Sequence, residues 1–166
     1  MHRTDRVMAD GRDLYYFDRF YDRGGDWYES HFPVDREQYT TVGEVSHDYM
    51  YSFDAAERIG SDYPGCKYIF CMRDPTERAL SHYRQSLKMG NVAGDIQNAL
   101  IENPRIVEHS RYGSHLKRFA ATNQTSKFLV ISFAEIATQP GLVAAGLYDF
   151  LGVDKGFATQ AARIQP

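Results

Sequence analysis

Residues 67–75 read KYIFCMRDP, and this stretch decides the fold class. The run at 67–72 is nearly continuously apolar and follows a Pro-Gly turn, which predicts a parallel strand buried on both faces. Arg73 then stands at the carboxyl end of that strand. Asp74 and Pro75 are residue types preferred at the N-cap and the first position of a helix. A strand that runs directly into a helix is the repeating unit of α/β folds.

Similar signals extend on both sides of this unit. Before it, we expect a helix over 26–32 with Asp26 as its N-cap, a short strand over 40–44 and a helix over 54–63. After it, we expect helices over 95–102, 113–122 and 140–152, and a second buried strand over 128–132. This order predicts an α/β fold with a mainly parallel sheet flanked by helices. Ligands bind beyond the carboxyl ends of the strands in such sheets, which directs attention to Arg73.

Length and composition indicate one globular domain. The 166 residues suffice for a single core, and we assign 1–13 as a flexible polar arm and 14–166 as the domain. With 19 Lys and Arg against 22 Asp and Glu, the formal net charge is −3, so nucleic-acid binding has no global electrostatic support. No apolar stretch is long enough to span a membrane, and a cytoplasmic location is the default expectation.

The two cysteines, Cys66 and Cys71, are five positions apart on either side of apolar residues. This spacing fits neither a zinc ligand pair nor a disulfide framework. We therefore expect two free thiols and no metal site.

The residues after the strand have the chemistry of a phosphate site. An arginine at a strand end, beside a helix N-terminus, offers a forked cation and free backbone N–H groups. Ser81, two turns into the helix, adds a hydroxyl on the same side. The alternative is that Arg73 pairs with Asp74 or another carboxylate, while Ser81 and His82 are ordinary residues of a helix surface.

The motif RDPxxRAxSHYR at 73–84 resembles the 3′-phosphate-binding motif of sulfotransferases that use PAPS (3′-phosphoadenosine-5′-phosphosulfate), especially the heparan-sulfate and related bacterial branch. The resemblance implies a P-loop-kinase-like fold and transfer of a sulfuryl group from PAPS to a hydroxyl or amine of a glycan or small molecule. It implies that Arg73 and Ser81 hold the 3′-phosphate. Further similar segments occur in the family's order, at 12–18, 21–32, 42–46 and 111–119.

The same resemblance suggests roles for three more residues. Glu44 corresponds to the glutamate of the family's Gly-Glu-Lys-Ser element and is the expected general base. Arg12 stands where the family has a lysine near the transferring group, and Tyr112 in the segment 111–119 is assigned to the nucleotide site. A solvated Glu44 and a merely exposed Arg12 are the alternatives. Departures include Tyr15 in place of a histidine, and Val45 in place of a lysine, while His47 and His82 are the nearest imidazoles.

A glycine-rich loop of the type Gly-x-x-Lys-x-Gly-Thr, which grips the 5′-phosphosulfate in the family, has no match in these 166 residues, and neither has its C-terminal Arg/Lys-Gly loop. We therefore expect a partial domain that keeps one half of the nucleotide site and turns over poorly by itself. The alternative function is a non-catalytic module of the same fold that binds a nucleotide, a glycan or a protein; a kinase-like enzyme is more remote. An uncovered sheet edge would favour self-association into a homo-oligomer.

Overall fold

The structure is a computed structural model that describes residues 13–33 and 41–154. Among these residues, no helix has both the length and the apolar character needed to cross a membrane. The elements are α1 (Tyr16–Arg19), η1 (Tyr21–Arg23), α2 (Gly25–Glu29), η2 (Tyr49–Tyr51), α3 (Phe53–Asp62), β1 (Lys67–Met72), α4 (Pro75–Lys88), α5 (Ile96–Glu102), α6 (Arg105–Glu108), α7 (Tyr112–Thr122), β2 (Lys127–Ser132), α8 (Phe133–Thr138) and α9 (Pro140–Leu151).

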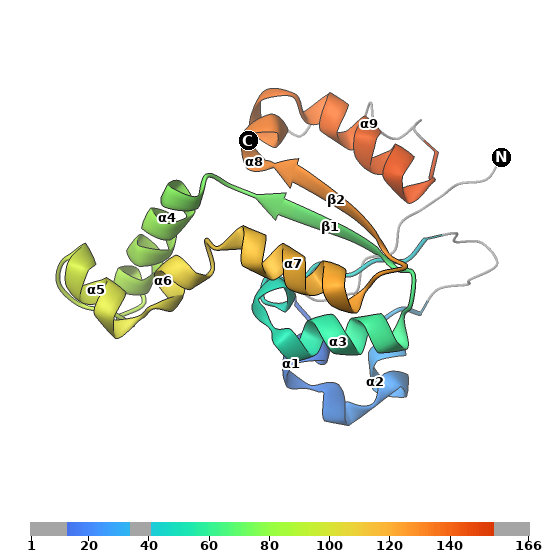
Figure 1. Cartoon of the computed structure of the whole chain (residues 1–166), viewed down its shortest axis with the longest axis horizontal. Coiled ribbons are helices and arrows are strands. Elements are labelled where there is room, and N and C mark those ends of the chain that lie inside the picture. Colours follow the sequence, from blue (N-terminus) through green and yellow to red (C-terminus); the bar gives the residue numbers. More distant parts are fainter. Residues whose placement is uncertain (1–12, 34–40, 155–166) are drawn as a thin grey trace.

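Strands β1 and β2 pair in parallel, in a register that runs from Lys67 opposite Lys127 to Met72 opposite Ser132. Helix α7 lies on one side of this sheet and α9 on the other, with α3, α1 and α2 beyond α7 (Figure 1). The predicted α/β architecture with helices flanking a parallel sheet is therefore confirmed. Strand β1 also has the predicted bounds.

The prediction that β1 is buried on both faces is wrong. Tyr68 and Phe70 are buried against α7, where their rings make edge contacts with Phe119. The alternate side chains, Ile69 and Cys71, are exposed. Because α7 covers only one face of β1, the strand shows the two-residue alternation of a half-buried strand. Both cysteines are free thiols, as expected.

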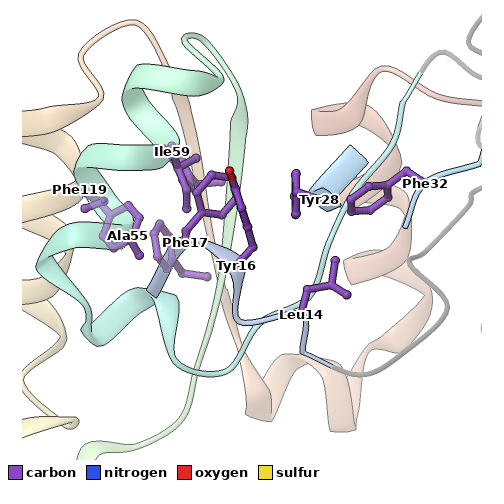
Figure 2. Packing of buried hydrophobic residues seen from close by; sticks show 11 residues of the cluster. Leu14, Tyr16, Phe17, Tyr28, Phe32, Ala55, Ile59 and Phe119 are labelled. Atoms are coloured by element: carbon purple, nitrogen blue, oxygen red, sulfur yellow. The ribbon is translucent and has the colours of Figure 1, made fainter. Parts of the chain in front are cut away.

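Rings from the N-terminal segments form an aromatic layer against α3. Figure 2 shows Tyr16 and Phe17 of α1 close to Tyr28 of α2. The Tyr16 and Tyr28 rings stack with centroids 4.6 Å apart, and the Phe17 ring meets Tyr28 edge-on at 5.0 Å. Aromatic pairs in these geometries add to the stabilisation that comes from burying their area. The layer therefore orders helices that are too short to be stable alone.

Of the predicted helix caps, Asp74 and Gly152 are confirmed and Asp26 is not. Asp74 caps α4 by accepting hydrogen bonds from the backbone N–H groups of Thr76 and Glu77, each at 2.9 Å. Helix α9 ends at Gly152, whose φ of 77° suits glycine. The proposed cap at Asp26 is wrong, because α2 begins one residue earlier, after Gly24.

Other predicted bounds need correction. The strand expected over 40–44 reduces to a single-residue bridge at Gly43 within the described residues 41–44. The flexible arm assigned to 1–13 falls almost wholly outside the described residues, which begin at Asp13. The short elements η1, α1, η2, α6 and α8 were not predicted, because three to six residues carry too little periodicity to identify a helix.

Helices α4, α5 and α6 form a lobe that projects to one side of the sheet (Figure 1). This lobe has its own small core of Val92, Ala99 and Ile106, with Ala79 and Tyr83 of α4 packed against it. The helix that carries Ser81 is therefore held by packing within the lobe.

Asn123, which is buried, ties α3, α7 and β1 together. Its side-chain N–H groups donate to the carbonyls of Ala56 and Phe119 at 3.0 and 3.1 Å, and its Oδ1 accepts from the Tyr68 hydroxyl at 2.7 Å. A Cβ atom on Gly60 would lie 2.5 Å from this same Oδ1. Only glycine fits against Asn123 at position 60.

We therefore expect Gly60→Ala to lower the free energy of unfolding by about 1–3 kcal/mol, as overpacking does. The clash outweighs the gain of about 1 kcal/mol that alanine brings to a helix interior. The matched control is Gly146→Ala in α9, where a Cβ would meet nothing within 4 Å and where stability should rise. Urea unfolding measures both, and equal effects of the two substitutions would contradict this account.

Candidate active site

Arg73 follows β1 directly and its side chain is exposed. Its Nε donates to Glu77 Oε2 at 3.0 Å, and its guanidinium lies 5.6 Å from the centre of the Phe133 ring at the start of α8. Arg73 does pair with a carboxylate, although with Glu77 rather than with Asp74, which caps the helix. An exposed pair of this kind contributes only about 0.3–0.5 kcal/mol, so a phosphate can replace the carboxylate.

Ser81 is exposed on α4, one turn after Glu77. Residues four apart on a helix are neighbours on its surface, so Glu77 and Ser81 share a face of α4. Arg73, which precedes the helix, is joined to this face by its pair with Glu77. The structure thus places the two predicted phosphate ligands on the same side of α4, with Glu77 between them. This face lies at the carboxyl end of a parallel strand, where ligands of α/β proteins bind.

Tyr112 is the first residue of α7 and is half-buried. The segment before it is fixed to α4, because Ser110 Oγ donates to the carbonyl of Pro75 at 2.8 Å and accepts from Arg78 Nε at 2.6 Å. Desolvation lowers the pKa of Arg78, and the nearby hydroxyls of Tyr51 and Tyr112 oppose this fall. Tyr112 therefore lies near Arg78 of α4, and among the described residues no hydrogen bond or ring contact joins it to Arg73 or Ser81, so its assignment to a nucleotide site stays a prediction.

Glu44 lies in the aromatic layer and not on α4. Its Oε2 accepts from the Tyr28 hydroxyl at 2.9 Å, and its Oε1 accepts from the Tyr49 hydroxyl at 2.8 Å. Desolvation raises the pKa of Glu44, while these two hydrogen bonds and one from the backbone of Leu14 act in the opposite direction. The alternative of a solvated strand-end glutamate is wrong, because the carboxylate is partly buried and hydrogen-bonded at both oxygens.

The turn η2 connects Glu44 to the lobe that carries Ser81. Tyr49 binds Glu44, and Tyr51 stacks on His109 with ring centroids 3.7 Å apart and planes within 8°. The His109 ring lies 5.6 Å from the ring of His82 on α4. The turn η2 therefore contacts Glu44, the candidate base, through Tyr49 and, through Tyr51, the His109 ring that lies beside the candidate nucleotide-binding helix α4.

The remaining candidates are held by other groups or fall outside the described part. The exposed His47 ring contacts Asp13 through Nδ1 at 2.7 Å. His82 Nδ1 accepts from Arg78 at 3.3 Å, and burial lowers the pKa of His82, an effect that Arg78 and Arg105 increase. Arg12 lies outside the described residues.

The two departures from the family pattern also have places in the structure. The Arg19 guanidinium lies over the Tyr15 ring, 4.2 Å from the ring centre. Val45 is exposed.

The His109 ring makes stability depend on pH. Burial lowers the pKa of His109 to about 4, and the nearby His82 and Arg78 side chains add to this shift. An unfolded chain has a histidine pKa near 6.5, so between about pH 6.5 and pH 4 the unfolded state binds more protons. Stability is therefore full above about pH 6.5 and falls as the pH drops toward 4.

We expect His109→Phe to keep the stack on Tyr51 and to flatten this decline. Thermal unfolding between pH 7 and pH 4 measures the slope for the parent and the variant. His31→Phe is the control, since the His31 ring also contacts an aromatic neighbour, Trp27, at 4.4 Å. A decline that His31→Phe flattens as much as His109→Phe would contradict the assignment.

Comparison with known proteins decides the family. Residues 62–163, more than half of the chain, match the sulfotransferase domain family. This chain belongs to the sulfotransferase family. The match includes β1, the α4 motif and α7, which are the segments that place Arg73, Ser81 and Tyr112.

Several curated sulfotransferases are similar to the chain. Heparan sulfate glucosamine 3-O-sulfotransferase 6 of Homo sapiens is 28% identical over 161 residues, which are 90% of this chain and 46% of that protein. The bifunctional heparan sulfate N-deacetylase/N-sulfotransferase 3 of Homo sapiens is 29% identical over 148 residues, 80% of this chain and 17% of that protein. The chain thus spans less than half the length of these relatives.

A solved sulfotransferase structure has the same fold. The crystal structure of a sulfotransferase from Alicyclobacillus acidocaldarius aligns with a TM-score of 0.78 and 22% identity, over 93% of this chain and 74% of that one. This likeness supports the partial α/β sulfotransferase fold expected from the sequence.

Sequence reasoning missed the residues that surround Glu44. Tyr28 and Tyr49 are two of 12 tyrosines, and nothing in their spacing marks them. Their partners come from other elements, so only tertiary structure reveals them. The sequence does contain many tyrosines on both sides of Glu44. That content is consistent with aromatic neighbours, but it does not identify which tyrosine donates a hydrogen bond to the carboxylate.

Proposed function

We propose that this sulfotransferase chain takes part in transfer of a sulfuryl group from PAPS to a hydroxyl or amine, with an amino sugar of a glycan as the favoured acceptor. The observation that carries the proposal is the face of α4 with Arg73 and Ser81 at the carboxyl end of β1. The names of the relatives, which describe 3-O- and N-sulfotransferases of heparan sulfate glucosamine, support the acceptor class.

In this proposal the 3′-phosphate of the nucleotide binds Arg73 and Ser81. The phosphate displaces Glu77 from the Arg73 guanidinium, which can then form a forked, charge-assisted pair with it. The Phe133 ring, 5.6 Å from the guanidinium, limits the directions in which the Arg73 side chain can turn. The backbone at the start of α4 adds no free donor for this anion, because Pro75 has no N–H, Asp74 caps the N–H groups of Thr76 and Glu77, and the Arg78 N–H donates to the Asp74 carbonyl.

Glu44 is the proposed general base. Its carboxylate accepts the proton of the acceptor O–H or N–H as the acceptor atom bonds to sulfur. The bond between sulfur and the bridging oxygen breaks, and adenosine 3′,5′-bisphosphate leaves with the electron pair. Burial raises the pKa of Glu44, which makes the carboxylate a stronger proton acceptor.

Nucleotide binding is tested by thermal unfolding with millimolar adenosine 3′,5′-bisphosphate. The ligand should raise the melting temperature of the unmutated chain by several degrees, since binding to the folded state stabilises it. Arg73→Ala should abolish the rise. Lys88→Ala removes a charge from the far end of the same helix and should leave the rise intact. Absence of a rise in the unmutated chain would rule out this nucleotide site.

Transfer is tested with PAPS and a glucosamine-containing glycan, by the release of adenosine 3′,5′-bisphosphate. We expect Glu44→Gln to lower kcat/KM by about 10²–10⁴-fold, the usual contribution of a general base. Glu29→Gln is the control, because Glu29 is another carboxylate that accepts a tyrosine hydroxyl, from Tyr63. Full transfer by Glu44→Gln would exclude Glu44 as the base. A melting shift without any transfer would instead favour a non-catalytic module.

A further inference from the structure

We propose that a cluster of three histidines is a proton-operated latch, which holds the lobe of α4, α5 and α6 in place while its imidazoles are neutral and releases the lobe when they take up protons. The cluster lies beside Tyr51 of η2 and consists of His82 on α4, His109 at the end of α6 and His115 on α7. The latch itself is independent of nucleotide binding. Its effect on the nucleotide site, through Ser81 on α4, rests on the proposed function.

The lobe depends on its attachment to the rest of the chain. Its own core consists of three buried apolar side chains, those of Val92, Ala99 and Ile106. A core of this size gives little stability, so local opening of such a unit needs less free energy than unfolding of the whole domain. Ser110, between α6 and α7, holds the two connections of the lobe together by donating to the carbonyl of Pro75 at 2.8 Å. The contacts made beyond these connections therefore decide whether the lobe stays closed.

Tyr51 joins the lobe to the aromatic layer. Its ring stacks on His109 with centroids 3.7 Å apart and planes within 8°, and it meets His115 edge-on at 5.2 Å. Tyr49, two positions earlier in η2, packs on Phe17 of the layer at 5.5 Å. Among the residues described before β1, Tyr51 is the only one whose ring contacts a ring of the lobe. Loss of this stack removes the ring contact that holds the lobe to the layer.

The hydrogen bonds of the cluster require neutral imidazoles. His82 Nδ1 accepts from Arg78 at 3.3 Å, and His115 Nδ1 accepts from Arg118 at 3.1 Å. A guanidinium can only donate, so each Nδ1 must keep its lone pair. His115 Nε2 then donates to the carbonyl of Glu108 at 2.9 Å. A proton on either Nδ1 would replace a hydrogen bond by repulsion between two cations.

Protonation of His109 is also unfavourable in the closed lobe. Its ring centroid lies 5.6 Å from that of His82, so two protonated rings would be adjacent cations. Burial lowers the pKa of His109 to about 4, and His82 and Arg78 add to this shift. A cation against the Tyr51 ring would gain a cation–π attraction, but this is one weak contact against desolvation and the nearby guanidinium. Burial also lowers the pKa of His82, as do Arg78 and Arg105.

Two acidic groups that lie near the cluster are already paired. Asp48, which precedes η2, raises the pKa of His109, but its carboxylate is bound by Arg19. Glu108, in the last turn of α6, pairs with Arg111 at 3.4 Å. The other titratable groups that face the cluster, from α4, α6, α7 and η2, are guanidiniums and phenols: Arg78, Arg105, Arg118, Tyr112 and Tyr51. Protons taken up by the cluster therefore add to a surplus of positive charge.

Opening of the lobe therefore follows the pH. In the released lobe the imidazoles meet water, where the histidine pKa is near 6.5, so between about pH 6.5 and pH 4 the open state binds more protons than the closed state. The closed state is fully favoured above about pH 6.5 and is lost progressively as the pH falls toward 4. For His109 alone, the difference between a pKa of about 6.5 and one of about 4 increases the opening equilibrium about thirtyfold between pH 7.5 and pH 5.

Hydrogen–deuterium exchange of the full chain, without nucleotide, measures the opening at pH 7.5 and pH 5 after correction for the intrinsic exchange rate. Protection in α5 and α6 reports on the lobe, and protection in α3 and α7 reports on the rest of the domain. We expect lobe protection to fall about thirtyfold between the two pH values and to lie below that of α3 and α7 at pH 5. Release of the lobe alone gives such a difference, whereas unfolding of the whole domain gives equal protection.

Three variants separate the contributions. His109→Phe keeps a ring on Tyr51 but cannot take up a proton, so its lobe should keep most of its protection at pH 5. Tyr51→Leu removes the stack and should lower lobe protection already at pH 7.5. His31→Phe is the matched control, because the His31 ring contacts the Trp27 ring at 4.4 Å and lies outside the cluster. This control should show the same fall as the parent.

The inference is overturned if α5 and α6 are as protected as α3 and α7 at pH 5, or if His109→Phe loses as much lobe protection as the parent. Parental lobe protection in Tyr51→Leu at pH 7.5 would overturn it as well. Because these measurements contain no nucleotide, they are independent of the proposed function. Failure of the proposed nucleotide site gives a different result, namely no melting shift with adenosine 3′,5′-bisphosphate.

Discussion

A partly buried carboxylate must find hydrogen-bond donors, and the Glu44 carboxylate finds them in three separate segments. Tyr28 comes from α2, Tyr49 from η2 and the Leu14 backbone from the residues before α1. These segments contain helices of only three to five residues, which have no stability of their own. The need to satisfy one charge therefore orders much of the N-terminal layer. The same hydrogen bonds that satisfy the charge also orient it.

The three-residue turn η2 gives the site its internal geometry. Tyr49 faces the Glu44 carboxylate, while Tyr51 lies on His109 and meets His115 of α7 edge-on at 5.2 Å. The aromatic layer and the lobe of α4, α5 and α6 thus share one rigid connection besides the chain itself. A shift of η2 would move Glu44 and, at the same time, change its position relative to α4, the candidate nucleotide-binding helix.

Sequence reasoning succeeded where local chemistry determines structure. The strand at 67–72 and the helix that Asp74 caps were predicted with their observed starts, because an apolar run and a capping residue act over a few positions. It failed where neighbours in space decide the outcome. The exposed side chains of Ile69 and Cys71 depend on which face α7 covers, and no local pattern encodes that choice.

The candidate site divides in the same way. Ser81 lies on α4 and Arg73 just before the cap of that helix, so a strand-to-helix pattern within a dozen residues was enough to place them near one another. Glu44 was singled out through a family resemblance. Its partial burial and its hydrogen bonds depend on tertiary structure, because Tyr28 lies 16 positions away in the sequence and ring packing holds the tyrosines in place. Hydroxyl–carboxylate pairs of this kind leave no periodic trace in a sequence, which is why Tyr28 and Tyr49 were not predicted.

The parallel register of β1 and β2 has a consequence for how the chain folds. Lys67 can meet Lys127 only after the chain has closed a loop that contains α4, α5, α6 and α7. Closing a long loop costs entropy before the strand pairing compensates for it, so non-local parallel pairs form slowly. The lobe of α4 to α6, whose contacts are local, can form before the sheet is complete. On this view α4, the candidate phosphate-binding helix, is an early structure, and the pairing of β1 with β2 is a late one.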